Sequence, residues 1–454
     1  MTQYSRRQLL KVGLGMAGAT GLGTALPGGM FYSASSQAAQ EYRSIVCVLL
    51  AGGADSFNMV VPRSDAAYSQ YQQRRSDLAL SKGDLLPLMA EHNGVTFGLH
   101  PALAGIQSRF NSGTAAFIAN IGPLSEPTDR ASYDAGTSGL PLGLFSHADQ
   151  IASWQTARPD RRSGTGFGGR LGDYLLSANP EIDLAANVSL SGNNLFQSGV
   201  NVNAYSVNAS EGVRTIGGYT DNATFSSALD TLINYESNNV LRNTYAAKMR
   251  TAIDTGQQLN AVLQDAPTLN TDFGDDYFSR AMARIAQIIS VREALGVTRQ
   301  TFFVTFGGWD HHADLLSEQA RMLPALDQGL SQFTTAMEEL GVGGQVTSFT
   351  ISDFGRTLTS NGKGSDHGWG GNNIVIGGAV QGGQIFGEFP ELVADNPLDV
   401  GRGRLIPTTA VDGLYAQIAQ WMGVPERDLP LVLPNWDVLA GQSQVTGLNG
   451  LLLG

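Results

Sequence analysis

The sequence predicts an α/β sandwich, and three features of the residue pattern support this prediction. Several runs of β-forming residues are apolar throughout, which is typical of strands buried on both faces of a parallel sheet. Segments with apolar residues at helical spacing separate these runs. Glycine-rich turns follow the runs, and the 56 glycines of the chain indicate many tight turns and close backbone approaches.

The predicted strands are short, apolar and bounded by turn residues. The first is the run RSIVCVLL, which opens into two glycines and then Asp55. The others also lack regular alternation of polar and apolar residues, so each is expected to lie inside the sheet. The expected strands cover residues 43–50, 114–122, 300–308, 346–355 and 372–380.

A long helix is predicted between the third and fourth strands. Residues 314–341 carry apolar side chains at helical spacing and end at Gly341, and Pro324 is expected to kink or interrupt the helix. A strand, a helix and a strand at this spacing predict a βαβ unit with a right-handed crossover. A shorter helix that ends at Gly113 precedes the second strand.

Residues 183–240 differ from the rest of the chain in composition. They are rich in Asn, Ser, Gly and Val and contain stretches of period two, so we expect an antiparallel polar insertion or cap. Helices are expected to follow as far as about residue 296. The whole insertion is therefore predicted to cover about residues 183–296 of one large domain, residues 40–454.

Charge and cysteine content restrict the classes of partner and site. The chain has 454 residues and a net charge of −12, which argues against nucleic acids and anionic membrane surfaces as partners. The single cysteine, Cys47, lies in the first predicted strand. An intramolecular disulfide and a metal site made of thiolates are therefore excluded.

The first 39 residues have the features of an export signal. Arg6 and Arg7 precede an apolar, glycine-rich stretch, and no acidic residue occurs before Glu41. These features indicate a twin-arginine signal rather than a membrane anchor or a buried helix. We therefore expect a periplasmic or extracellular protein with the twin-arginine translocation machinery as a partner. After removal of the signal, no segment is long and apolar enough to span a bilayer.

Acidic and imidazole residues gather after the predicted strands. Loops at the carboxyl ends of parallel strands meet at one edge of a sheet, where ligands bind. Asp55 follows the first strand, and Asp310, His311 and His312 follow the third. The other candidates are Asp353, Arg356, Asp366 and His367 after the fourth strand, and Ser146, His147, Asp149 and Gln150 in the motif LFSHADQ.

These residue types together suit a divalent metal ion. Carboxylates and imidazoles bind Zn²⁺, Mn²⁺, Mg²⁺ or Ca²⁺ without thiolates. Two such ions can stabilise both the attacking and the leaving oxygen of a phosphoryl or sulfuryl transfer. Each residue alone also has a structural explanation. An Asp after a strand often caps a turn or helix, Ser146 can be a helix N-cap, and Arg356 can pair with an acidic neighbour. Their common placement at one sheet edge favours a shared site.

Several motifs, in their order along the chain, resemble those of one family. They are LLAGGADSFNMVVP, GLHPAL, FSHADQ, GGWDHHADL, SDFGRT and DHGWGG. Together they resemble the bacterial exported family known as domain of unknown function 1501, over nearly all of the mature chain. That family is grouped with the alkaline phosphatase and sulfatase superfamily. The resemblance implies a three-layer sandwich, with a central mixed, mostly parallel sheet flanked by helices, and a metal-dependent hydrolase site.

The resemblance also implies roles for individual residues. The positions that match the metal ligands of the superfamily are Asp55, Asp310, His312, Asp353 and His367. His311 lies where family members usually have Thr, and Phe354 stands where the superfamily has His, so one imidazole of the second metal site is missing. Ser146 is the candidate nucleophile, with Ser56 or water as alternatives, and Arg356 is the candidate for binding the anionic substrate.

These features predict an exported hydrolase of phosphate or sulfate esters that depends on one or more divalent metal ions. Its substrate would be an anionic small-molecule or polymer ester. The alternative is a non-catalytic exported protein that keeps the fold as a binding or assembly module in the cell envelope. In that case residues 183–240 would form its contact surface.

Overall fold

The computed structural model describes residues 41–453, except residues 177–185, 211, 214–215 and 236. The expected export signal, residues 1–39, lies outside the described residues. Within the described ranges, no helix is both long enough and apolar enough to cross a membrane.

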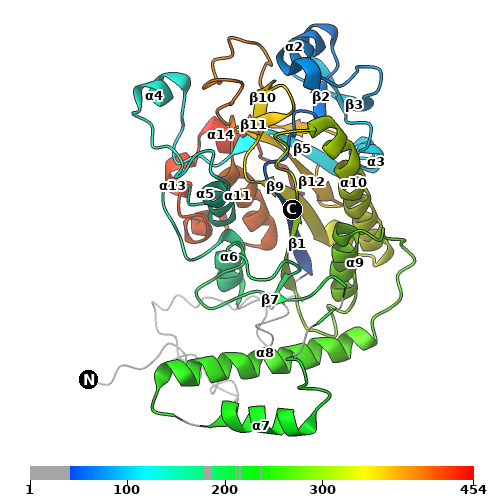
Figure 1. Ribbon diagram of the computed structural model, residues 1–454, viewed down its shortest axis with the longest axis vertical. Helices are drawn as coiled ribbons and strands as arrows, with labels where there is room; N and C mark the ends of the chain where they lie inside the picture. Colours follow the sequence, from blue (N-terminus) through cyan, green and yellow to red (C-terminus); the bar gives the residue numbers. More distant parts are fainter. Residues whose placement is uncertain (1–40, 177–185, 211, 214–215, 236, 454) are drawn as a thin grey trace, which may run out of the picture. The chain divides into compact units, whose positions relative to one another are not determined.

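A sheet of nine strands forms the centre of the described chain (Figure 1). Its strands are β1 (Arg43–Ala51), β5 (Ala115–Gly122), β6 (Asn187–Ser189), β7 (Tyr205–Ser206), β8 (Arg299–Gly307), β9 (Val346–Ser352), β12 (Gly371–Gly377), β13 (Ile385–Phe386) and β14 (Thr409–Ala410). The strand order is β13-β5-β12-β9-β1-β8-β6-β7, and β14 pairs with β5 beside this path. Only the pairings of β12 with β9 and β5 are antiparallel, so the sheet is mixed and mostly parallel, as predicted.

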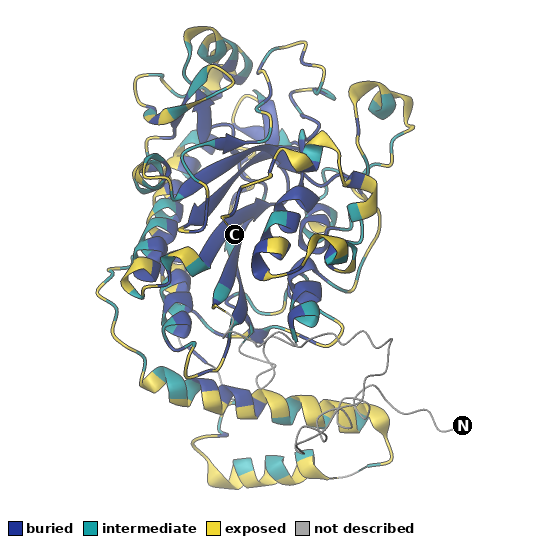
Figure 2. Cartoon of the chain, turned by 180° about the vertical axis from the view of Figure 1, so that it is seen from behind, coloured by how far each residue is buried: buried dark blue, intermediate teal, exposed yellow. Residues whose placement is uncertain are grey.

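Helices cover both faces of this sheet, because alternate side chains of its strands point to opposite sides. Val48 of β1 packs into one hydrophobic cluster and Cys47 into another. The first cluster takes side chains from α3 (Ala104–Asn111), α9 (Tyr277–Ser290) and α10 (Leu315–Glu339). The second takes side chains from α5 (His147–Thr156), α6 (Phe167–Leu175), α11 (Val411–Met422) and α12 (Leu429–Val432). The predicted three-layer sandwich is confirmed, and Figure 2 shows its buried central strands.

Further elements complete the described part of the chain. Two additional sheets are formed by β2 (Val60–Pro62), β3 (Leu86–His92) and β4 (Val95–Leu99), and by the pair β10 (Arg356–Ser360) and β11 (Ser365–His367). The remaining α-helices are α2 (Asp65–Arg75), α4 (Arg130–Ala135), α7 (Ala223–Asn234), α8 (Val240–Gln264), α13 (Trp436–Leu439) and α14 (Ser443–Thr446). Short 3₁₀-helices are η1 (Ser76–Leu78), η3 (Gly343–Gln345) and η4 (Glu426–Asp428).

The five predicted strands are all present, but two other predictions need correction. Pro324 does not interrupt α10, which runs as one helix held to the core by buried residues on either side of the proline, Leu323 and Leu326. The insertion is not an antiparallel unit. Its strands β6 and β7 pair in parallel and extend the main sheet beyond β8, and helices follow them as expected.

A buried acid lies in the first turn of α11. Asp412 is completely buried, and burial raises its pKa to about 7, although its own backbone N–H and the charge of Arg170 act in the opposite direction. An unfolded Asp has a pKa near ~3.9. Between these two values the folded protein holds a proton that the unfolded chain releases, so this residue makes stability fall as the pH rises.

We predict that Asp412→Asn removes this pH dependence. Relative to the native protein, the free energy of unfolding of the variant should rise between pH 4.5 and pH 7, by up to roughly 1.4 kcal/mol for each pH unit. Urea unfolding at several pH values measures this difference. Asp395→Asn, at an exposed position, is the control and should show no such trend. A constant difference between Asp412→Asn and the native protein across this pH range would contradict the prediction.

Candidate functional site

The candidate site lies at the carboxyl edge of the central strands. The parallel register pairs Ala51 with Gly307 and Leu50 with Ser352, so β1, β8 and β9 end side by side. The loops that follow these strands therefore start at the same level. Gly52 has φ +119°, and a Cβ there would lie only 2.5 Å from the backbone nitrogen of Asp310. Glycine is therefore required for the loop after β1 to approach the loop after β8.

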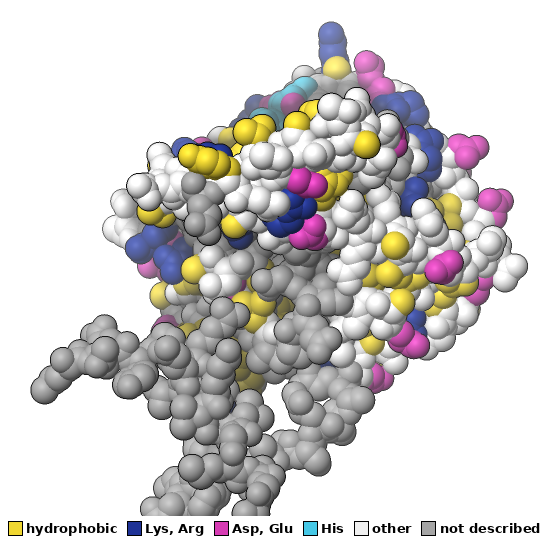
Figure 3. Space-filling model, turned by 90° about the horizontal axis from the view of Figure 1, so that it is seen from below, with side chains coloured by type: hydrophobic (Ala, Val, Ile, Leu, Met, Phe, Trp, Pro, Cys, Tyr) yellow, Lys and Arg dark blue, Asp and Glu magenta, His cyan; other side chains and the backbone are white. Residues whose placement is uncertain are grey.

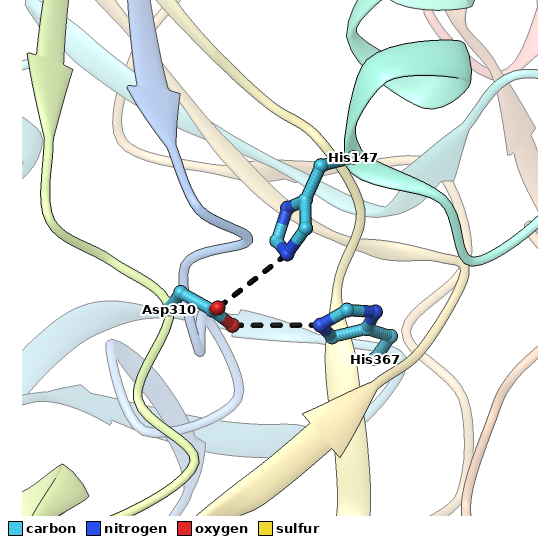
Figure 4. A group of neighbouring side chains, drawn as sticks. All are labelled: His147, Asp310 and His367. Carbon is cyan, nitrogen blue, oxygen red and sulfur yellow. Dashed lines mark ion pairs between the residues drawn. The ribbon is translucent and has the colours of Figure 1, made fainter.

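Three side chains converge at this edge (Figure 4). His147 comes from the first turn of α5, Asp310 from the loop after β8, and His367 from the end of β11. The carboxylate of Asp310 lies 3.5 Å from Nε2 of His147 and 3.4 Å from Nε2 of His367. One ligand atom from each of the three residues lies within 4.8 Å of the other two. This arrangement is suitable for holding a metal ion.

His312 lies next to this group. Its Nε2 is 3.0 Å from the Asp310 carboxylate and 2.9 Å from Nε2 of His367. Its Nδ1 is 3.1 Å from the carboxylate of Asp366, which also pairs with Arg402 at 2.7 Å. The structure thus brings together the predicted residues Asp310, His312 and His367.

Hydrogen bonds behind the imidazoles determine which ring nitrogen carries the proton. Nδ1 of His367 lies 2.8 Å from the carbonyl of Phe145, which can only accept, so this nitrogen is protonated. Nδ1 of His147 lies 2.6 Å from the buried carboxylate of Asp353 and donates to it. In the neutral rings, the Nε2 lone pairs then point toward the group. Partners of this kind commonly orient metal-binding histidines.

This donor set fits a metal ion. The lone pairs of Nε2 in His147 and His367 face the carboxylate of Asp310, and lone pairs at these distances repel one another unless a proton or a cation lies between them. Burial lowers the pKa of His367 and favours its neutral form. Burial by itself raises the pKa of Asp310, but the hydrogen bond and charge of Arg356, together with His312 and His147, bring it below its ordinary value. The site therefore combines a neutral imidazole, that of His367, with the ionised carboxylate of Asp310.

His147 is the functional residue that the sequence reasoning did not select as a ligand. Its ring centre lies 4.9 Å from that of Phe354, the residue at which the superfamily comparison implied a missing imidazole. The ring of His367 lies 4.4 Å from the same phenylalanine. An imidazole is thus present beside Phe354, but it comes from another segment of the chain. The motif LFSHADQ was the sequence signal that could have identified it.

Arg356 is not placed to bind a substrate, and its predicted role is corrected. Its side chain is fully buried and donates to the carbonyls of Gly52 (2.6 Å), Gly53 (2.7 Å), Trp309 (3.2 Å) and Ser365 (2.8 Å). It also forms an ion pair with Asp310. With its donors occupied, Arg356 holds the loops together and positions Asp310 instead of facing open space.

Asp55 is not one of the three converging side chains, so the structure does not support its predicted role as a ligand. Its carboxylate is fully buried in an ion pair with Arg75 of α2. Arg75 in turn donates to the backbone carbonyl of Thr357, 3.0 Å away. The carboxylate of Asp55 is engaged in this way because folding places the buried guanidinium of Arg75 beside it.

The remaining candidates have distinct surroundings. Asp353 is buried, which raises its pKa, and it contacts His147 while accepting from the Gly52 N–H at 3.1 Å. It therefore lies behind the ligand atoms. Ser56 is buried, and its hydroxyl accepts from the Asn372 backbone at 2.6 Å, so it is not available as a nucleophile. Ser146 is the N-cap residue of α5, and its side chain makes no capping hydrogen bond.

We predict that Arg356→Met lowers the free energy of unfolding by at least about 2 kcal/mol, because buried carbonyls lose a charged donor. Arg402→Met is the control: its side chain is 48% exposed in its pair with Asp366, and such pairs contribute about 0–1 kcal/mol. Chemical unfolding of both variants provides the comparison. Equal, small effects in both variants would show that Arg356 does not hold the loops together.

Several solved structures are similar to the chain at low identity. They include Ps i-CgsB, with 12% identity and a TM-score of 0.37 over 90% of this chain and 78% of that one. The PsFucS1 sulfatase from Pseudoalteromonas sp. has 10% identity and a TM-score of 0.34 over 85% and 69% of the two chains. A mutant of the alkaline phosphatase PafA has 13% identity and a TM-score of 0.22 over 70% and 64%.

Comparison with curated proteins gives no match. A family profile described as "Protein of unknown function (DUF1501)" matches residues 42–428. This match covers most of the 454 residues and confirms the resemblance carried by the motifs. The chain belongs to the DUF1501 family.

Proposed function

We propose that this protein is an exported, metal-dependent hydrolase of phosphate or sulfate esters. The observation that carries the proposal is the convergence of His147, Asp310 and His367, with one ligand atom from each within 4.8 Å of the others. These residues come from segments far apart in the sequence, and they meet at the sheet edge where α/β proteins bind ligands. The export signal expected in residues 1–39 supports a periplasmic or extracellular location.

The three converging residues would hold one divalent ion, with His312 adjacent as a further donor. Imidazole and carboxylate ligands suit Zn²⁺ or Mn²⁺ better than Ca²⁺ or Mg²⁺, which favour oxygen ligands. When bound, such an ion supplies positive charge for the non-bridging oxygens of an anionic ester. Because the Arg356 side chain is buried, it contributes little of that charge directly.

The protein's own residues set the orientation of the site. Asp353 and the carbonyl of Phe145 fix the rings of His147 and His367 from behind, at 2.6 and 2.8 Å. Arg356 keeps Asp310 ionised and in place. Preorganised groups of this kind stabilise charge that develops during reaction without having to move.

Ser146 is the proposed nucleophile. It lies between Phe145, whose carbonyl orients His367, and His147, and its half-buried side chain makes no capping hydrogen bond. Its oxygen would form a bond to phosphorus or sulfur while the bond to the leaving alcohol breaks, and water would then release the acid. Direct attack by water is the alternative.

We predict that the full-length protein binds Zn²⁺ or Mn²⁺ and hydrolyses aryl phosphate or aryl sulfate esters. His367→Ala and Asp310→Ala should each weaken metal binding about 10-fold or more and lower kcat/KM at least as strongly, because each removes a ligand. Calorimetric titration and steady-state kinetics measure the two effects. His92→Ala, a substitution on β3, is the control. Unchanged metal affinity in both site variants would exclude this metal site.

We further predict that Ser146→Ala keeps the metal affinity of the native protein but loses turnover about 100-fold or more, because the hydroxyl that forms the intermediate is gone. Metal titration and ester hydrolysis on the same preparation separate the two properties. Native turnover in Ser146→Ala would assign the attack to water.

A non-catalytic binding module is the second candidate function. It is favoured by one observation: α7, inside the insertion predicted to be a contact surface, has no buried residue. Metal binding that depends on Asp310, together with no turnover of any phosphate or sulfate ester, would favour this candidate over the hydrolase.

A further inference from the structure

The hairpin of α7 and the first half of α8 has an unusual surface. Among the described residues from 221 to 250, none is buried. Figure 2 shows α7 without a buried segment, whereas the strands of the sheet are buried along most of their length. Many of the exposed large hydrophobic side chains of the described chain lie here: Phe225 (40% exposed), Leu232 (63%), Tyr235 (65%), Val240 (76%), Leu241 (81%) and Tyr245 (66%).

Four residues of α7 and its C-cap form an outward stripe. Phe225, Ala228, Leu232 and Tyr235 follow one another at intervals of three, four and three residues, and all four are exposed. Such spacing places side chains on one face of a helix and is typical of a helix–helix contact. The partly buried residues Leu229 and Ile233 belong to a different face, so the pairing of α7 with α8 does not use the stripe.

The charge carried by α7 is paired within the hairpin. Asp230 is the only charged residue of α7, and it pairs with Arg250 of α8 at 2.5 Å and accepts from the hydroxyl of Tyr219 at 2.8 Å. The guanidinium of Arg242 lies 4.6 Å from the centre of the Tyr235 ring and donates to the carbonyls that end α7. The outward stripe of α7 therefore contains no charged residue. Figure 3 shows the molecule from below, with hydrophobic side chains beside uncharged and charged ones.

We propose that the stripe of Phe225, Ala228, Leu232 and Tyr235 binds the same stripe of a second copy of this chain about a two-fold axis. A patch that is apolar and uncharged is complementary to itself, which a two-fold interface requires. The small side chain of Ala228, between larger residues, lets two helices approach closely. Leu241 and Tyr245, one turn apart on α8, are exposed as well.

Charge favours a second copy over other occupants. The chain has a net charge of −12, so two copies repel each other over most of their surface. The uncharged stripe is a place where they can meet with little repulsion. The same negative charge disfavours nucleic acids and anionic lipids as partners for this face. The inference does not depend on the proposed hydrolase activity, because no residue of the hairpin belongs to the candidate site.

Sedimentation of the full-length chain over a range of concentrations tests the proposal. We expect a dimer for the native protein, and at least about a tenfold weaker dimer for Leu232→Glu, because the substitution places two negative charges in one interface. Leu431→Glu is the matched control, since Leu431 is 65% exposed outside the hairpin, and it should dimerise like the native protein. Circular dichroism confirms that the variants are folded.

Cross-linking gives a second measurement. Cys47, the single native cysteine, is buried, so Ala228→Cys introduces an accessible thiol. A short bis-maleimide should link two copies of Ala228→Cys but not two copies of Ala135→Cys, an exposed alanine of α4. A monomeric native protein, an unchanged dimer in Leu232→Glu, or a monomer that sediments with neutral or anionic lipid vesicles through the stripe would each overturn the proposal.

Discussion

The buried guanidinium of Arg356 is the contact on which the candidate site depends. It joins the loops after β1 and β8 to β11 by donating to carbonyls of Gly52, Gly53, Trp309 and Ser365, and it pairs with Asp310. One planar group with five donors satisfies these acceptors together. The loops cannot separate without leaving buried carbonyls unpaired, which costs free energy for each. The position of Asp310 is thus a consequence of how two loops and β11 are held together.

Around this arrangement, buried acceptors decide the chemistry of the imidazoles. The carbonyl of Phe145 accepts a hydrogen bond from Nδ1 of His367, and the carboxylate of Asp353 accepts one from Nδ1 of His147. The Nε2 atoms of both rings therefore face Asp310. The carboxylate of Asp353 is shielded from solvent, whereas that of Asp310 is half-exposed. The two aspartates therefore have different roles. Asp353 orients the ring of His147, and the oxygens of Asp310 face the converging imidazoles.

The hairpin of α7 and α8 differs from the candidate site in how it is held. The hairpin of α7 and α8 adds no buried residue between 221 and 250 among those described, so the core does not require that part of it. Asp230 and Arg250 pair within the hairpin, while the chain as a whole has a net charge of −12. An apolar, uncharged surface that the core does not require can form contacts with a partner without disturbing the candidate site at the edge of the sheet. The site and this surface can therefore be tested separately.

The sequence by itself determined the strands and much of the site. Unbroken apolar runs predict buried parallel strands, and residues directly after them, such as Asp310 and His312, must lie at the carboxyl edge. Tertiary structure decided the roles of the charged groups, because each role depends on the partner that folding supplies. Asp55 forms an ion pair with Arg75, and Arg356 donates hydrogen bonds to backbone carbonyls. His147 forms a hydrogen bond with Asp353, 206 residues away along the chain. No local pattern encodes such distant pairings, so only the folded chain could show them.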